Sequence, residues 1–221
     1  MYSIAIDGPA GAGKSTIAKI IAEKTGFIYV DTGAMYRAMA LYFLRKGIDA
    51  EDVSSIEKVC PEVSVSLTYV DGEQQVILNG ENVNGLIRTE EVSRMTSASS
   101  KHKPVRMKLV QLQRELAKKE NVIMDGRDIG TYVLPDATAK IYLTASVSER
   151  ARRRYEEQKE RGEDCSLDEI ARDIEARDYQ DMHREFAPLC QAEDAVLVDS
   201  SYMSIEQVAD TIIKIFQEKK N

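Results

Sequence analysis

The sequence is poor in cysteine. Cys60, Cys165 and Cys190 are its only cysteines, they lie far apart, and no two of them form a CxxC pair. Because disulfide frameworks and zinc sites need closely spaced or evenly paired cysteines, this distribution argues against both. We therefore interpret the three as reduced thiols of a cytosolic protein.

Long apolar runs and targeting signals are also missing. The chain enters the apolar stretch 2–6 at once, with no basic region before it and no cleavage site after it, so we expect no signal peptide. No apolar run approaches the roughly 20 residues that span a bilayer. The sequence thus predicts a cytoplasmic protein without a membrane partner.

An excess of positive charge is absent too. The net charge is −7, which argues against a broad basic surface for polymeric nucleic acid but leaves room for a local cluster of arginines around a small anion. The 221 residues, 43% of them hydrophobic and 30% charged, suit one folded domain with a sizeable core. No heptad pattern or long apolar seam is visible, so we expect a monomer.

Short apolar runs alternate with longer helical patterns along most of the chain. Strands are predicted at 3–7, 27–30, 122–125, 140–143 and 195–198, and helices at 13–25, 33–46, 104–119, 148–161 and 204–219. This alternation is typical of an α/β fold with a parallel sheet. Two helix starts carry capping-box pairs, Ser166 with Glu169 and Ser204 with Gln207.

The segment 62–86 breaks this rhythm. Val63, Val65 and Leu67 alternate with polar residues, and the dipeptides 71–72 (Asp-Gly) and 79–80 (Asn-Gly) are strong hairpin-turn signals. The segment is therefore predicted to be an inserted antiparallel β-meander.

The strongest motif is a glycine-rich loop between the first strand and the first helix. It fits G-x-x-x-x-G-K-[ST], whose backbone amides surround phosphate oxygens at a helix N-terminus. Lys14 would bridge the β- and γ-phosphates of ATP, and the Ser15 hydroxyl would be a ligand of Mg²⁺. The predicted ATP contacts in this loop are Gly8, Pro9, Ala10, Gly11, Ala12, Gly13, Lys14, Ser15 and Thr16.

Two further motifs follow predicted strands. Asp31, Thr32 and Arg37 lie where the second strand passes into a helix, and strand carboxyl ends line the ligand crevice of such sheets. Arg37 would reach an anion there; the alternative is a solvated helix arginine.

The second of these motifs, at 125–131, begins Asp-Gly-Arg-Asp. Asp125 occupies the position of a Walker B-type carboxylate near Mg²⁺, and Arg127 and Asp128 are predicted at the mouth of the crevice. A plain β-turn with surface charges is the alternative.

Two charged helical segments leave more than one interpretation. Arg177, Asp181 and Arg184 share one helix face, which could bind a sugar and a phosphate or form an intrahelical ladder of ion pairs. The segment 149–162 could close over ATP with Arg150 and Arg154, or be a solvated helix with the pairs Glu149–Arg153 and Arg152–Glu156. Arg106, by itself, would be interpreted as solvated.

Taken together, these blocks resemble the bacterial cytidylate kinase family, in order and over essentially the whole chain. The matching segments are 6–16, 31–37, 125–131, 177–178, 187–189 and 199–208. The Gly-Ala-Met-Tyr-Arg and Asp-Gly-Arg-Asp blocks are far more specific than the phosphate loop. Thr32 stands where relatives often carry serine, and the hydroxyl is kept.

The resemblance implies a P-loop NTPase-type three-layer parallel-sheet core with an inserted antiparallel β lobe and a helical lid. We expect the core at 1–60, 104–147 and 188–221, the acceptor-binding lobe at 61–103, and the lid and following helix at 148–187. The implied activity is transfer of the γ-phosphoryl group of ATP to CMP or dCMP, with Lys14, Asp125, Arg127 and Arg184 as catalytic residues.

The resemblance also implies the contacts of the acceptor nucleotide. Ser97, Arg106 and Asp128 would contact the cytosine base. Arg177 and Asp181 would contact the sugar, while Arg37, Arg127 and Arg184 would hold the acceptor phosphate; Thr32 lies beside them in its motif. Two alternatives stay open: a kinase for another nucleotide or small metabolite, and a non-catalytic nucleotide-binding protein.

Overall fold

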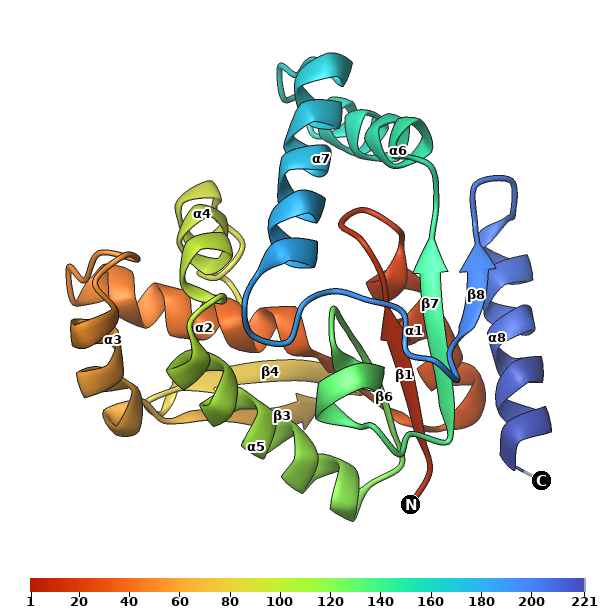
Figure 1. Cartoon of the computed structure of the whole chain (residues 1–221), viewed down its shortest axis with the longest axis horizontal. Helices are drawn as coiled ribbons and strands as arrows, with labels where there is room; N and C mark the ends of the chain where they lie inside the picture. The colour runs from red at the N-terminus through yellow and green to blue at the C-terminus, as the bar shows by residue number, and fades with distance from the viewer. Residues whose placement is uncertain (221) are drawn as a thin grey trace. The chain divides into compact units, whose positions relative to one another are not determined.

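A computed structural model describes residues 1–220 of the chain (Figure 1). Its internal contacts divide the chain into two compact units. The first comprises Met1–Tyr29 and the chain from Glu120 onward, and the second is Val30–Lys119. The three-part division expected from the sequence is a different partition and stays a prediction.

A parallel sheet forms the centre of the first unit. Its strand order is β2-β6-β1-β7-β8, with β1–β6, β1–β7 and β7–β8 all paired in parallel. The strands are β1 (Ser3–Asp7), β2 (Ile28–Asp31), β6 (Val122–Gly126), β7 (Ala139–Thr144) and β8 (Val196–Asp199), and β2 crosses the boundary between the units. Ile4, Ala5 and Ile6 are completely buried, so β1 is covered on both faces as its unbroken apolar run predicts.

Four α-helices and one π-helical turn complete the first unit. They are α1 (Lys14–Thr25), α6 (Val147–Glu160), α7 (Leu167–His183), α8 (Ile205–Lys220) and the turn at Ile129–Val133. The main core joins apolar residues of α1 and α8 to the sheet. A separate small core around Ala151, Ile170 and Ile174 holds α6 against α7, the two helices that cross at the top of Figure 1.

The second unit contains a small antiparallel sheet and four α-helices. The sheet has the order β3-β4-β5, with strands at Val65–Val70, Glu73–Leu78 and Glu81–Asn82. The helices are α2 (Thr32–Arg45), α3 (Val53–Val59), α4 (Glu90–Ser99) and α5 (Lys103–Lys119), and a short 3₁₀ turn follows α3 at Cys60–Glu62.

The predicted meander is confirmed together with both of its turns. Asp71 and Gly72 have φ values of 51° and 80°, and Asn79 and Gly80 have 49° and 88°. Positive φ at both central residues is the geometry of a type I′ hairpin, which matches the twist of the flanking strands. The turn residues therefore determine where β3, β4 and β5 begin and end.

All five predicted strands and all five predicted helices are present, each within two residues of its expected bounds. Helix α4 and the π-helical turn were not predicted. The sequence of α4, Glu-Glu-Val-Ser-Arg-Met-Thr-Ser-Ala-Ser, is rich in serine and threonine, which are weak helix formers. Its signals are the Thr89 cap, which accepts a hydrogen bond from Val92 N, and two glutamates in the first turn.

No helix within residues 1–220 is long and apolar enough to cross a membrane.

Candidate active site

The glycine-rich loop links β1 to α1 and closely approaches the neighbouring strand β7. Gly8 has φ 150°, and a Cβ atom there would lie 1.9 Å from the carbonyl oxygen of Leu143. Any other residue would therefore force the loop away from the sheet. Gly13, with φ 84°, is the N-cap of α1, so the helix begins at Lys14 and its first amides face the loop.

Lys14 is buried, and its ammonium group spans the loop. Lys14 Nζ donates to the carbonyl oxygen of Pro9 at 2.6 Å. Burial lowers the pKa of Lys14 well below its ordinary value, and the charges of Arg127 and Arg177 lower it further against the opposing effect of Asp125 and Asp181. A phosphate anion beside Lys14 would favour the charged form, so the site is electrostatically suited to one.

Ser15 and Asp125 meet at the start of α1. Ser15 Oγ donates to Asp125 Oδ2 at 2.9 Å, and Tyr29 Oη donates to Asp125 Oδ1 at 2.9 Å. Asp125 lies in β6 and is buried. Hydroxyl and carboxylate oxygens are the ligand types that Mg²⁺ prefers, usually with phosphate and water completing the shell.

A buried ion pair lies against the tip of the glycine-rich loop. Asp178 of α7 accepts from Ala10 N at 3.0 Å and from Arg150 Nη1 at 2.6 Å. Arg150 Nη1 also donates to the Ala10 carbonyl oxygen at 2.7 Å, and Arg150 Nε donates to the Ala145 carbonyl oxygen at 2.9 Å. Arg150 therefore contacts the loop, whereas Arg154 on the same helix is exposed. That either arginine binds ATP stays a prediction.

The loop after β6 is joined to α7 and to the residue that follows it. Arg127 Nε donates to Asp181 Oδ2 at 2.7 Å. Arg184 donates from Nη2 to Asp128 Oδ1 at 3.2 Å and from Nε to the Ala187 carbonyl oxygen at 2.7 Å. Burial opposes ionisation of Asp181, but the charges of Arg127, Arg177 and Arg184 outweigh it and lower the pKa of this carboxyl.

These contacts decide between the two interpretations of the α7 face. The close partner of Asp181 is Arg127 from another segment, while Arg184 Nη1 is 3.8 Å from Asp181 Oδ1. Arg184 is also the C-cap, with ψ 143°, and not a helical residue as predicted. The face is therefore not a simple intrahelical ladder; it gathers Arg127, Asp128, Asp181 and Arg184 into one charged cluster.

Asp7 belongs to the site and was not singled out from the sequence. Its two carboxylate oxygens accept from Ile129 N and Gly130 N, each at 2.7 Å, directly after the loop that carries Arg127 and Asp128. Burial raises the pKa of Asp7 to about 6, and the two backbone hydrogen bonds oppose that rise. Its position at the end of β1, just before Gly8, was the available signal.

In the second unit, the predicted residues of the 31–37 motif form the first turns of α2. Asp31 caps the helix by accepting from Ala34 N at 2.9 Å, and Arg88 Nη2 lies 3.2 Å from its other oxygen. Thr32 is buried. Arg37 Nη1 would be 3.4 Å from a Cβ placed on Gly33, so its guanidinium lies over the N-terminal turn of the same helix.

Arg106 is buried and not solvated, contrary to what its local sequence indicated. Only 1% of its surface is exposed, its guanidinium lies 5.2 Å from the ring centre of Tyr36, and Nη1 donates to the Ser100 carbonyl oxygen at 3.1 Å. Ser97 lies half-buried on α4, in the same unit. A fully buried arginine is costly unless it is well paired, which marks Arg106 as a candidate functional residue.

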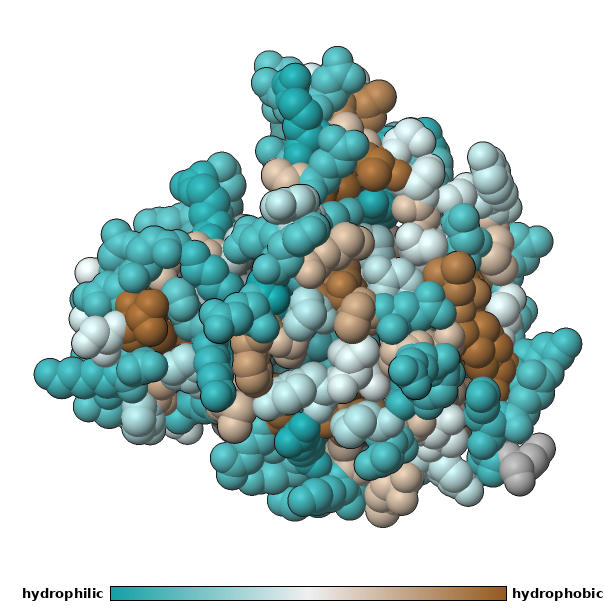
Figure 2. All heavy atoms as spheres, viewed as in Figure 1, coloured by the Kyte–Doolittle hydropathy of each residue, from teal (hydrophilic) through white to brown (hydrophobic). Residues whose placement is uncertain are grey.

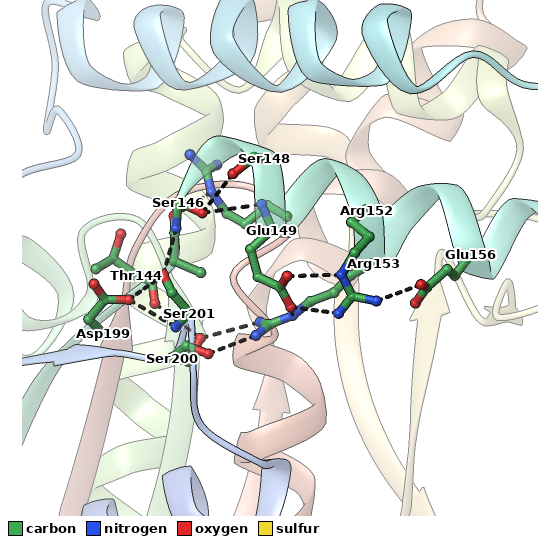
Figure 3. Close-up of polar contacts among 12 residues, drawn as sticks. Thr144, Ser146, Ser148, Glu149, Arg152, Arg153, Glu156, Asp199, Ser200 and Ser201 are labelled. Atoms are coloured by element: carbon green, nitrogen blue, oxygen red, sulfur yellow. Dashed lines mark hydrogen bonds and ion pairs between the residues drawn. The ribbon is translucent and has the colours of Figure 1, made fainter.

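Helix α6 is held at its start and ion-paired along its exposed side (Figure 3). Ser146 Oγ caps Glu149 N at 3.2 Å, and Arg153 Nη2 donates to the Ser200 carbonyl oxygen at 2.8 Å. The two predicted pairs, Glu149–Arg153 and Arg152–Glu156, are both present. These arginines pair with glutamates of the same helix, which explains how the helix can be polar on nearly every side.

Comparison with known proteins gives one consistent family. The family model described as "Cytidylate kinase" matches residues 4–218. A curated cytidylate kinase of Caldicellulosiruptor saccharolyticus is 50% identical, over 97% of this chain and 95% of that protein. The cytidylate kinase of Bacillus subtilis is 46% identical, over 98% of this chain and 97% of its own length.

A solved structure gives a more distant likeness. An uncharacterised protein from Eubacterium ventriosum matches with a TM-score of 0.56 at 12% identity, over 98% of this chain and 99% of that one. At this identity the likeness shows a shared fold and nothing about activity.

Proposed function

Because the chain belongs to the cytidylate kinase family and thus transfers the γ-phosphoryl group of ATP to CMP or dCMP, we propose which of its residues perform each part of that reaction. The observation that carries the proposal is the contact between Ser15 and Asp125 at 2.9 Å. It joins the last residue of the glycine-rich motif to a carboxylate near the carboxyl end of β6, which is the arrangement that a triphosphate and its metal ion need.

On the donor side, the amides at the start of α1 and the ammonium of Lys14 hold the triphosphate of ATP. Ser15 and Asp125 would hold Mg²⁺, which neutralises phosphate charge when bound. Residues 1–220 contain no cluster of three or more histidine, cysteine or acidic side chains suited to a metal. A site of one hydroxyl and one carboxylate fits Mg²⁺ all the same, because phosphate and water supply its other ligands. Arg150 and Arg154 are the predicted arginines of the lid.

On the acceptor side, Arg127 and Arg184 hold the phosphate of CMP in line with the bond that breaks, and Arg177 and Asp181 hold its sugar. In this type of reaction the transition state is largely dissociative, so positioning and charge neutralisation provide most of the catalysis. An ionised phosphate is already a nucleophile, and no general base is required. Thr32 and Arg37 of the second unit are further predicted contacts of the acceptor.

The base is recognised by hydrogen-bond polarity. Asp128 accepts from the cytosine N4 amino group, and Arg106 with Ser97 contacts the N3 and O2 acceptors. Asp128 is buried, so a group that does not match its carboxylate would not be compensated by water. Uracil would present O4 to the carboxylate and N3–H to the arginine, at a cost of about 1–3 kcal/mol for each mismatch.

An ADP-release assay with CMP, dCMP, UMP and AMP tests these assignments. We expect turnover of CMP and dCMP, and kcat/KM for UMP lower by about 10-fold or more. Arg127→Gln and Arg184→Gln should each lower kcat/KM for CMP by about 100-fold, because each removes a charge beside the transferred group.

Arg152→Gln is the matched control, since Arg152 is an exposed arginine that pairs with Glu149 and Glu156. It should retain normal turnover. Undiminished CMP turnover in folded Arg127→Gln and Arg184→Gln would place the acceptor phosphate elsewhere. Equal kcat/KM for CMP and UMP would refute the assignment of the base contacts.

We also propose a cytoplasmic monomer whose partners are ATP, CMP and dCMP, without nucleic acid polymers or membranes. The net charge of −7 supports the first exclusion, since nucleic acid binding rests on basic surface.

A further inference from the structure

The ion pair between Asp178 and Arg150 is buried, and its contribution to the stability of the fold does not by itself explain why. Asp178 is 7% exposed and Arg150 is 4% exposed. Taking two charges out of water costs several kcal/mol for each ion. Replacing a buried ion pair by apolar residues of similar volume often leaves the folded protein equally stable or more stable. The pair therefore needs a reason beyond stability.

That reason lies in what the pair holds. The Ala10 N–H donates to Asp178 at 3.0 Å, and the Ala10 carbonyl accepts from Arg150 at 2.7 Å. Both polar groups of one residue at the tip of the glycine-rich loop are thus fixed by side chains of α6 and α7. A Cβ on the next residue, Gly11, would lie 3.4 Å from Arg150 Cβ, so the helix packs directly on the loop.

Helix α7, which carries Asp178, also reaches the loop after β6. Asp181 lies three residues after Asp178 on α7 and accepts from Arg127 at 2.7 Å. Arg184, at the end of α7, contacts Asp128 at 3.2 Å. A single helix and its C-cap residue thus contact the loop that binds the triphosphate and the loop that carries Arg127 and Asp128.

We propose that Asp178 is a positioning residue that makes binding of ATP and binding of CMP depend on each other, by tying α7 to the tip of the glycine-rich loop. Triphosphate binding that orders the loop would, through Ala10 and Asp178, hold α7 and with it Asp181 and Arg184 in the arrangement that CMP needs. The proposal rests on the assignment of donor and acceptor residues given above.

The test is the effect of an ATP analogue on CMP affinity. The dissociation constant of CMP is measured by calorimetry with and without saturating β,γ-methylene-ATP and Mg²⁺. We expect the analogue to tighten CMP binding about 5-fold or more in the wild-type protein, within the usual range of coupling between sites. In Asp178→Ala this ratio should fall to about 1, because no side chain of α7 then accepts from the Ala10 N–H.

Arg152→Ala is the control, since Arg152 lies on the exposed side of α6 and pairs with Glu149 and Glu156 of its own helix (Figure 3). It should keep the wild-type ratio. If Asp178→Ala does not fold, Arg150→Lys is the second variant. It keeps the positive charge but is one bond too short to place its nitrogen where Arg150 Nη1 donates to Ala10 and Asp178, and it loses the Nε donor to Ala145, so the same fall is expected.

Two results would overturn the proposal: no effect of the analogue in the wild-type protein, or a wild-type ratio in the folded variant. A merely structural role for Asp178 would lower stability and leave the ratio unchanged. Failure of the functional assignment is a separate outcome, because it would show as absent CMP turnover in the wild-type protein.

Discussion

At the scale of single residues, Asp7 shows how a buried carboxylate can organise a site without contacting a substrate. It binds two consecutive amides of the π-helical turn, 122 and 123 residues away in the chain. Those amides follow Arg127 and Asp128 directly in the chain, so Asp7 holds in place the segment that carries both residues. Burial and the charge of Asp128 raise its pKa, while the two backbone hydrogen bonds and Lys14 lower it, and the net value is about 6.

The raised pKa predicts a pH dependence of stability. Between the ordinary carboxyl pKa of 3.8 and the raised pKa of about 6, the native state binds more protons at Asp7 than the unfolded chain does. The free energy of unfolding therefore contains a favourable contribution at low pH that is lost as pH rises through this window. Urea unfolding at several pH values should show wild type losing stability relative to Asp7→Asn as pH rises.

Asp52→Asn provides a control of opposite sign. Asp52 caps α3, and its hydrogen bonds with Ser55 lower its pKa, so its contribution is present above 3.8 and is lost as pH falls. If the stabilities of wild type and Asp7→Asn changed in parallel between pH 3.8 and about 6, the pH dependence assigned to Asp7 would be contradicted.

At the scale of elements, the two predicted capping boxes have different outcomes. Ser204 and Gln207 form one: Gln207 N donates to Ser204 Oγ at 3.2 Å, and Ser204 N donates to Gln207 Oε1 at 2.8 Å. Ser166 is the N-cap of α7, but its side chain makes no capping hydrogen bond, so the predicted box with Glu169 is wrong. The two sequences satisfy the same pattern, and only the side-chain geometry separates them.

This difference predicts that replacing serine by alanine at the two caps lowers the free energy of unfolding by unequal amounts. Ser204→Ala should lower the free energy of unfolding by about 1 kcal/mol, because a first-turn amide of α8 loses its partner. Ser166→Ala should change it by less than ~0.5 kcal/mol, as an ordinary surface substitution does. Urea unfolding of both variants measures this, and equal losses would argue against the distinction.

The hairpins were predicted accurately, whereas α4 and the π-helical turn were not. An Asp-Gly or Asn-Gly pair readily adopts the positive φ values that the centre of a hairpin turn requires, so the local sequence is enough to predict the turn. The turn at Ile129–Val133 instead depends on hydrogen bonds from its amides to Asp7, which no local pattern reveals.

At the scale of the whole molecule, charge and surface composition are the properties that bear on the proposed monomer. A net charge of −7 opposes the close approach of two copies through mutual repulsion. On the face shown in Figure 2, hydrophilic residues predominate and hydrophobic ones gather only in small separate groups. Large continuous apolar patches are the usual mark of a stable interface between copies.

Light scattering after size exclusion tests this expectation. We expect a mass of 24.8 kDa, independent of protein concentration and of added ATP or CMP. A mass that rises toward twice this value with concentration would indicate a dimer and would contradict the proposal. Measurement at two ionic strengths separates charge repulsion from the lack of an apolar interface, because salt screens only the former.

The sequence by itself determined the strands, most helices, the hairpin turns and the glycine-rich loop, because each depends on residues that are close together in the chain. It also predicted Ser15 at the start of the helix after the glycine-rich loop, and Asp125, Arg127 and Asp128 at the carboxyl end of a strand, since parallel strands bring those ends to one edge. Only the tertiary structure decided that Arg106 is buried, that Asp7 holds the π-helical turn and that Asp178 contacts Ala10. The Asp178–Ala10 hydrogen bond joins residues 168 positions apart. Burial and such contacts depend on which distant segments pack together, and no local pattern contains that information.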